Sequence, residues 1–120
     1  MDEFEFEIKN YNSKEIYELF SKLETEKDLL HIYRYEAIMK RAIEIAREIK
    51  DFNSLDWLEN TVKKNHFNPI MKKAQKNKTK GIYATTNKEF KDFLIELGAA
   101  LSQLERLTDF HIKKSNTNLL

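Results

Sequence analysis

The residues best suited to chemistry in this 120-residue chain are lysines that gather in one segment. Residues 60–88 contain eight lysines and no Asp or Glu, whereas residues 1–59 and 89–120 both carry a net negative charge. The formal net charge of +1 therefore hides a strongly basic block. Ammonium groups gathered in this way bind phosphates, so the block indicates a surface for nucleic acid. The candidate nucleic-acid-binding residues are Lys63, Lys64, Lys72, Lys73, Lys76, Lys78, Lys80 and Lys88.

The block also contains the polar and aromatic residues that nucleic-acid surfaces use, among them Asn65, His66, Phe67 and Tyr83. Lys and Asn side chains contact the phosphate backbone, and bases stack on aromatic rings. Because no base-reading motif is present, we expect non-specific binding. The preferred contacts are Lys63, Lys64, Lys72 and Lys73.

A second use for part of the block is internal. Residues 3–9 alternate between acidic and apolar side chains, which predicts a half-buried strand with Phe4, Phe6 and Ile8 on its inner face. A strand needs a partner for its backbone, and residues 78–85 are β-tolerant around Gly81. Pairing these segments would set the lysines at 76, 78 and 80 against the glutamates at 3, 5 and 7.

Residues for catalysis or metal binding are sparse. The chain has no cysteine, and its three histidines are far apart in sequence, without metal-ligand spacing. Two glycines cannot build a phosphate-binding loop, and the serines lie in capping, helix-surface or tail contexts rather than in a strand–Ser–helix elbow. We therefore predict no catalytic residue, no metal and no cofactor.

One spacing offers a catalytic alternative. Arg106 and His111 are separated by four residues, which resembles the Arg-x4-His motif of small all-helical HEPN-type ribonucleases. That family usually has a polar residue directly after the arginine, where this chain has Leu107. The resemblance covers two residues and implies RNA cleavage only as a second alternative.

The elements that must position these residues are mostly helices. Apolar spacing predicts a first helix capped by Asn12 or Ser13, a central helix from about Thr25 to Asp51, and a third helix from Ser54. Asn68 and Pro69 indicate the start of a short fourth helix. Residues 86–89, a capping box, open a last helix over about 87–112.

The last helix carries apolar residues at heptad spacing. This seam is long enough for either of two uses, core packing within the chain or a homodimer contact. A small-residue stretch, 98–100, would allow a close helix crossing in either case. The candidate dimer seam comprises Phe93, Leu97, Ala100, Leu104 and Leu107.

The fold class expected is mainly α, a bundle of four to five helices with a small two-stranded β element formed by residues 3–9 with about 78–85. Residues 1–114 form one helical domain, and residues 115–120 form a frayed tail. An acidic N-terminus and the lack of a long apolar stretch predict a cytoplasmic protein without a membrane contact.

The function expected is a small non-enzymatic nucleic-acid-contacting subunit or regulator. The first alternative is a protein-binding module, such as an inhibitor, immunity or adaptor protein of phage or plasmid type, acting through its acidic helices or last helix.

Overall fold

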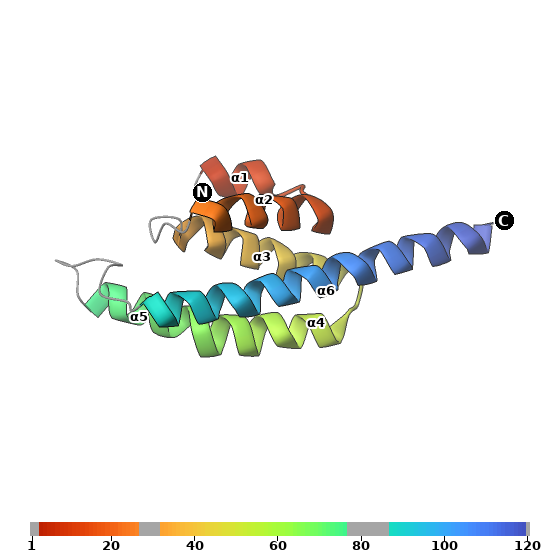
Figure 1. Cartoon of the computed structure of the whole chain (residues 1–120). Coiled ribbons are helices and arrows are strands. Elements are labelled where there is room, and N and C mark those ends of the chain that lie inside the picture. Colours follow the sequence, from red (N-terminus) through yellow and green to blue (C-terminus); the bar gives the residue numbers. More distant parts are fainter. Residues whose placement is uncertain (1–2, 27–31, 77–86, 120) are drawn as a thin grey trace.

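The computed structural model describes residues 3–26, 32–76 and 87–119, with side chains described for 4–23, 32–73 and 88–107. These residues are almost entirely helical, which confirms the mainly α helical bundle (Figure 1). None of the described helices is both long enough and apolar enough to cross a membrane. The elements are α1 (Glu3–Ile8), α2 (Ser13–Glu26), α3 (Ile32–Glu48), α4 (Phe52–Asp56), η2 (Trp57–Phe67), α5 (Asn68–Lys76) and α6 (Asn87–Leu119).

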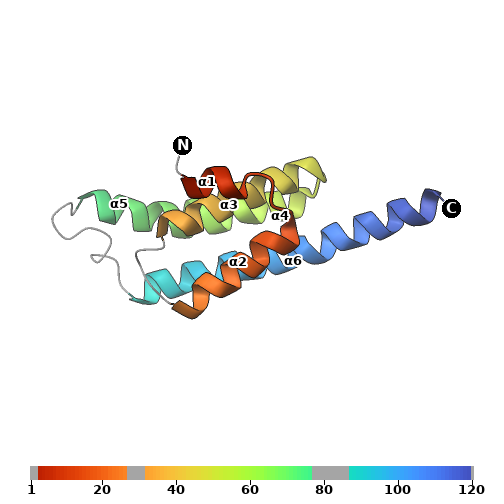
Figure 2. The ribbon, with the colours of Figure 1, turned by 90° about the horizontal axis from the view of Figure 1, so that it is seen from above.

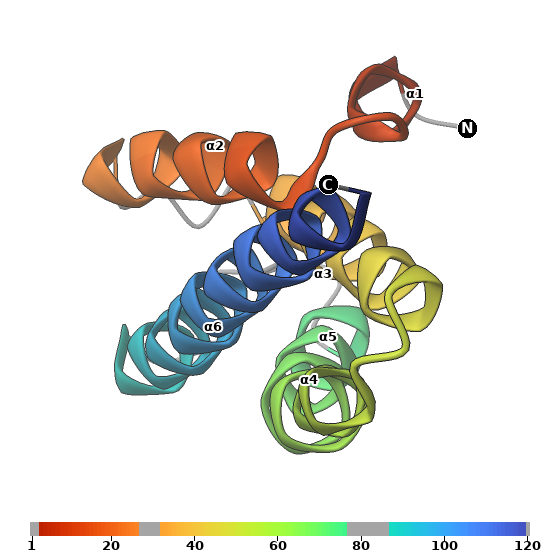
Figure 3. The same ribbon diagram turned by 90° about the vertical axis from the view of Figure 1, so that its right-hand side faces the viewer.

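Helix α3 is the centre of the bundle, and α1, α2, α4, η2 and α6 all contact it (Figure 3). More than half of its residues are buried, because neighbouring helices contact it from several sides. Tyr35 is fully buried, and its ring meets those of Phe20 and Phe93 edge-on. The core therefore lies where α2 and α6 close over α3.

The predicted strand at residues 3–9 is wrong, because residues 3–8 form the short helix α1, which packs on α3. Phe4 and Ile8 are four residues apart, so they share one face in a helix just as they would in a strand. Ile8 is buried and Phe4 packs against the core, but Phe6 is 61% exposed. A helix satisfies its own backbone hydrogen bonds, so this segment needs no strand partner. The proposed partner, residues 78–85, lies outside the described residues.

Helix α2 begins as predicted, with a reciprocal cap. The Asn12 backbone N–H donates to Glu15 Oε1 (3.1 Å), and the Glu15 backbone N–H donates to Asn12 Oδ1 (2.8 Å). The helix runs to Glu26, so Thr25 lies inside it rather than capping the next helix as predicted. The central helix is described from Ile32 onward.

Helices α2 and α6 cross closely at Gly98. A Cβ atom added there would lie 2.9 Å from Cε1 of the Phe20 ring, which is closer than real Cβ atoms approach other atoms. The small-residue stretch at 98–100 thus provides the close crossing expected of it. Figure 2 shows α2 passing over α6 at an angle.

Helix α3 ends in a left-handed residue, Lys50, with a φ of 59°. The Asp51 N–H donates to the carbonyl of Ala46 (3.0 Å), and the Lys50 N–H donates to that of Arg47 (3.1 Å). This is the hydrogen-bond pattern of a Schellman motif, which usually has glycine at the left-handed position. Asp51 then caps α4 by accepting from the Ser54 N–H, so the cap lies three residues before the Ser54 predicted for it.

Residues 52–76 form one continuous helical rod, in which η2 is a π-helix of 11 residues. At its end the Asn68 N–H donates to the carbonyl of Lys63, five residues earlier. Helix α5 begins at Asn68, as predicted, but Asn68 has helical dihedral angles and so continues the rod from η2 rather than capping a new helix. Pro69 has no N–H and its ring would press on the carbonyl four residues earlier in a regular α-helix, which favours a wider register just before it.

Helix α6 starts at Asn87, as predicted, and continues to Leu119, beyond the predicted end at 112. The first four residues of the heptad seam, from Phe93 to Leu104, are each 0% exposed within the single chain. Leu107, the fifth, is half-buried. The end of α6 extends past the other helices (Figure 1), and the molecule measures 60 × 26 × 25 Å.

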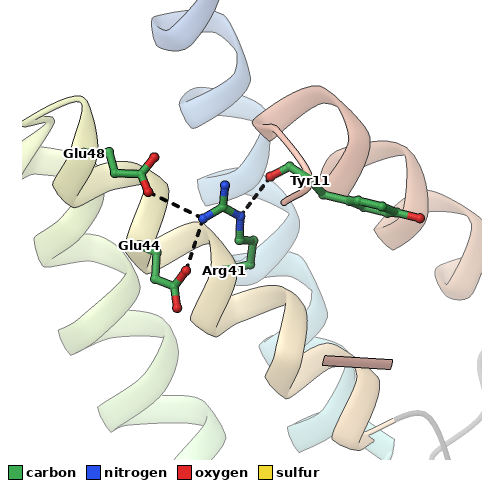
Figure 4. A network of polar contacts seen from close by, with 4 residues as sticks. All are labelled: Tyr11, Arg41, Glu44 and Glu48. Carbon is green, nitrogen blue, oxygen red and sulfur yellow. Dashed lines mark hydrogen bonds and ion pairs between the residues drawn. The ribbon is translucent and has the colours of Figure 1, made fainter. Parts of the chain in front are cut away.

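A polar network joins the link between α1 and α2 to the centre of the bundle (Figure 4). The Arg41 Nε donates to the backbone carbonyl of Tyr11 (2.9 Å), while its Nη1 lies 3.1 Å from Glu44 and 3.6 Å from Glu48. Only 13% of the Arg41 side chain is exposed. The arginine thus fixes the chain entering α2 against α3.

Candidate nucleic-acid interface

The described part of the predicted basic block, residues 60–76 and 87–88, lies at the end of the bundle where η2 passes into α5 and α6 begins (Figures 1 and 2). Lys64 on η2, Lys72 on α5 and Lys88 at the start of α6 are exposed, and Lys63 on η2 is half-buried. None of these four ammonium groups has an ion pair within the described residues. They are the described part of the block that is free to meet a phosphate.

Lys73 has a different position. Its ammonium group is paired with the carboxylate of Glu89, which ties α5 to α6. One of the four preferred contacts is therefore engaged in holding two helices together. Both side chains are partly exposed, so the pair lies at the surface.

The remaining lysines of the block are less fully described. Lys76 is the last residue of α5, and its side chain lies outside the described side chains. Lys78 and Lys80 lie outside the described residues altogether. The glutamates proposed as their partners belong to α1, where Glu5 lies 3.9 Å from Lys40 of α3.

A hollow opens between the three elements that carry the exposed lysines. Its volume is about 220 Å³, which is smaller than the roughly 300–1,000 Å³ that is common for small-ligand pockets. η2, α5 and α6 each contribute side chains to its wall. The lining residues are Asn65, His66, Pro69, Ile70, Lys73, Glu89 and Asp92.

Three polar side chains of this hollow are not used by the fold. Asn65, His66 and Asp92 make no hydrogen bond or ion pair with another described residue, although His66 and Asp92 are half-buried. Polar groups that converge on a concave surface without protein partners are typical of ligand sites. The basic block pointed to Asn65 and His66, but Asp92 carries no signal in the sequence that would connect it with them.

The two aromatic rings considered for base stacking are not both accessible. Phe67 is 3% exposed and packs against Phe93, with ring centroids 5.7 Å apart. It is therefore a core residue. Tyr83 lies outside the described residues.

The catalytic alternative can be followed only at one of its two residues. Arg106 is exposed and lines a shallow hollow with Asn53, Gln103 and Leu107. The side chain of His111 lies outside the described side chains. Within the part of the chain that the structure describes, no three His, Asp or Glu side chains are grouped closely enough to hold a metal ion.

Comparison with known proteins identifies no relative. No protein-family model, no curated protein and no solved structure matches this chain.

Proposed function

We propose that this protein binds nucleic acid through the surface formed by η2, α5 and the start of α6, as a small non-enzymatic subunit or regulator. The observation that carries the proposal is that Lys64, Lys72 and Lys88 come from three different elements, converge on one end of the bundle and remain without an ion pair among the described residues. Lys9, Lys14 and Lys50 also lack an ion pair among the described residues, so this surface is distinguished by the gathering of its lysines at one end of the bundle and not by their lack of partners.

The acidic residues support the same surface by their distribution. The last acid before the block is Glu59, which is bound to Arg47, and the first acid after it is Glu89, which is bound to Lys73. The carboxylates that flank the block are thus neutralised by partners. A phosphate backbone approaching the exposed lysines would meet a positive potential.

The experiment compares two triple variants with equal net charge. Lys64→Gln, Lys72→Gln and Lys88→Gln together remove the exposed lysines of the surface. Lys9→Gln, Lys14→Gln and Lys50→Gln remove three exposed lysines, one just after α1, one in α2 and one just after α3. Binding of a labelled oligonucleotide is measured by fluorescence anisotropy across a salt series that starts at about 50 mM, where electrostatic contacts are strong.

The surface variant should bind more weakly than the wild type, and its log–log salt slope should flatten by about 0.7–0.9 per lost contact. The control variant should keep most of the wild-type slope. Equal losses in both variants would show that only net charge matters and would contradict the proposed surface. If the wild type itself does not bind DNA or RNA at low salt, the nucleic-acid function is wrong and the protein-binding module takes its place.

A further inference from the structure

We infer that the hollow between η2, α5 and α6 takes a single unstacked base that carries an exocyclic amino group, with Asp92 as the acceptor of its N–H. This inference rests on the proposed function, because the hollow is reached by the strand that the surrounding lysines hold. It adds a base preference to a surface that otherwise contacts only phosphates.

Asp92 is the residue that needs an explanation. Its carboxylate is only partly exposed, and it has no ion pair or hydrogen bond with another described residue. It also lies in the wall of a hollow whose other carboxylate, Glu89, already holds Lys73. Asp92 is thus an acceptor left open toward the hollow.

The lysines on the same elements limit the kinds of ligand that the Asp92 carboxylate can bind. Three lining residues of the hollow, Asn65, Lys73 and Glu89, are each preceded in sequence by an exposed lysine, namely Lys64, Lys72 and Lys88. None of these three lysines lines the hollow itself, but their positive charge on the surrounding elements would still repel a free amine or a cationic side chain. A nucleotide has both required parts, a phosphate for the lysines and a base-edge donor for the carboxylate.

The remaining lining suits the face and edge of a base. His66 offers an imidazole ring on which a base can stack, and Pro69 and Ile70 offer apolar contact. Asp and Glu side chains accept hydrogen bonds from the amino group of cytosine. In uracil the same ring position carries a carbonyl oxygen, which would repel the Asp92 carboxylate.

The test uses two oligonucleotides whose bases differ only at this edge: cytosine has an amino group at C4 and an N3 acceptor, whereas uracil has a carbonyl oxygen at C4 and an N3–H donor between two carbonyl oxygens. Binding of labelled oligo(dC) and oligo(dU) of equal length is measured for the wild-type chain, for Asp92→Asn and for Glu105→Gln. Glu105 is a half-buried acid on the same helix, and it is not among the residues that line the hollow, so its variant removes the same charge at another place. Circular dichroism and thermal melts check that all three are folded.

We expect the wild type and Glu105→Gln to prefer oligo(dC) by about fivefold or more, in line with one base contact. Asn can pair with either base, so the preference of Asp92→Asn should fall to about one, with an unchanged salt slope. Equal binding of both oligonucleotides by the wild type, or a preference that survives in Asp92→Asn, would overturn this inference and leave the proposed function standing. No binding of either oligonucleotide by the wild type would overturn both.

Discussion

Lys50 occupies a backbone conformation that suits a glycine better than a lysine. Its φ of 59° lies in the left-handed region, where the Cβ atom of an L-residue approaches the following carbonyl oxygen. The two Schellman hydrogen bonds hold it there because they satisfy the last carbonyls of α3. The end of α3 therefore carries a local strain that the surrounding hydrogen bonds compensate.

Replacing this residue should relieve the strain. We expect Lys50→Gly to raise the free energy of unfolding by about 0.5–1 kcal/mol, measured by urea denaturation. Lys50→Ala is the matched control, since it removes the same charged side chain but keeps the Cβ atom. A glycine variant no more stable than the alanine variant would show that Lys50 is not strained.

Gly98 is a position where a larger residue does not fit. Helix propensity alone favours alanine over glycine by about 1 kcal/mol. The added Cβ would press on the Phe20 ring, which is 2% exposed and confined by Tyr35, so it has little room to retreat. Overpacking of a core costs about 1–3 kcal/mol.

We therefore expect Gly98→Ala to lower the free energy of unfolding, by about 1 kcal/mol once the gain in propensity is subtracted. Ala99→Gly at the exposed neighbouring position serves as the control, and its loss should reflect propensity alone. A Gly98→Ala variant more stable than the wild type would mean that α2 and α6 do not cross as closely as described.

At the scale of elements, α1 offers the sharpest contrast between strand and helix. The alternating sequence puts Phe6 and Ile8 on the same side of a strand, but the helix exposes Phe6 and buries Ile8. We expect Ile8→Ala to cost about 2–5 kcal/mol and Phe6→Ala less than about 0.5 kcal/mol. Thermal and urea melts measure the stability of both variants. Equally large losses of stability in the two variants would mean that residues 3–9 form the predicted strand after all.

The elements that the sequence predicts well are those with local signals. Asn12 with Glu15 fixes the start of α2 by hydrogen bonds within one turn of helix, and the capping-box sequence at 86–89 correctly predicts that α6 starts at Asn87. The strand prediction failed because period-2 alternation over six residues also contains the i, i+4 spacing of a helix. A short segment therefore takes the form that its tertiary contacts favour.

The candidate site likewise has a part that the sequence predicts and a part that it does not. The basic block can be located from the sequence alone, since it is a run of lysines without acids along the chain. The hollow could not be predicted, because it joins Asn65, Pro69 and Asp92 from three elements and depends on how α6 lies against η2. The ion pair between Lys73 and Glu89 could not be predicted either, because it depends on how α5 lies beside α6.

At the scale of the whole molecule, the heptad seam has a partner inside the chain. Leu104 is 0% exposed in the core, so Leu104→Asp would bury a charge and should unfold the protein. Leu107→Asp, at the half-buried end of the same seam, should leave it folded. Circular dichroism measures whether each variant is folded, and analytical ultracentrifugation measures whether it is a monomer or a dimer. A dimeric wild type together with a folded, monomeric Leu104→Asp variant would place the seam between chains.

The charge of the whole molecule is also polarised. The acids of residues 1–59 lie mostly on α1, α2 and α3, and the described lysines of the block lie on η2, α5 and the start of α6. Such an arrangement orients the molecule toward a polyanion before contact, and salt weakens this steering. Because residues 1–59 and 89–120 both carry a net negative charge, they would not compete with the block for the same polyanion.

The widened turns of η2 set the rotational phase between the two ends of the rod formed by residues 52–76. A helix with i→i+5 hydrogen bonds advances through a smaller angle per residue than an α-helix, and this lag accumulates over 11 residues. It determines that Ile70 faces inward while Lys72 faces solvent. Deleting one residue within η2 would rotate α5 about the axis of the rod. Its lysines would then face away from those of α6, although every lysine would still be present.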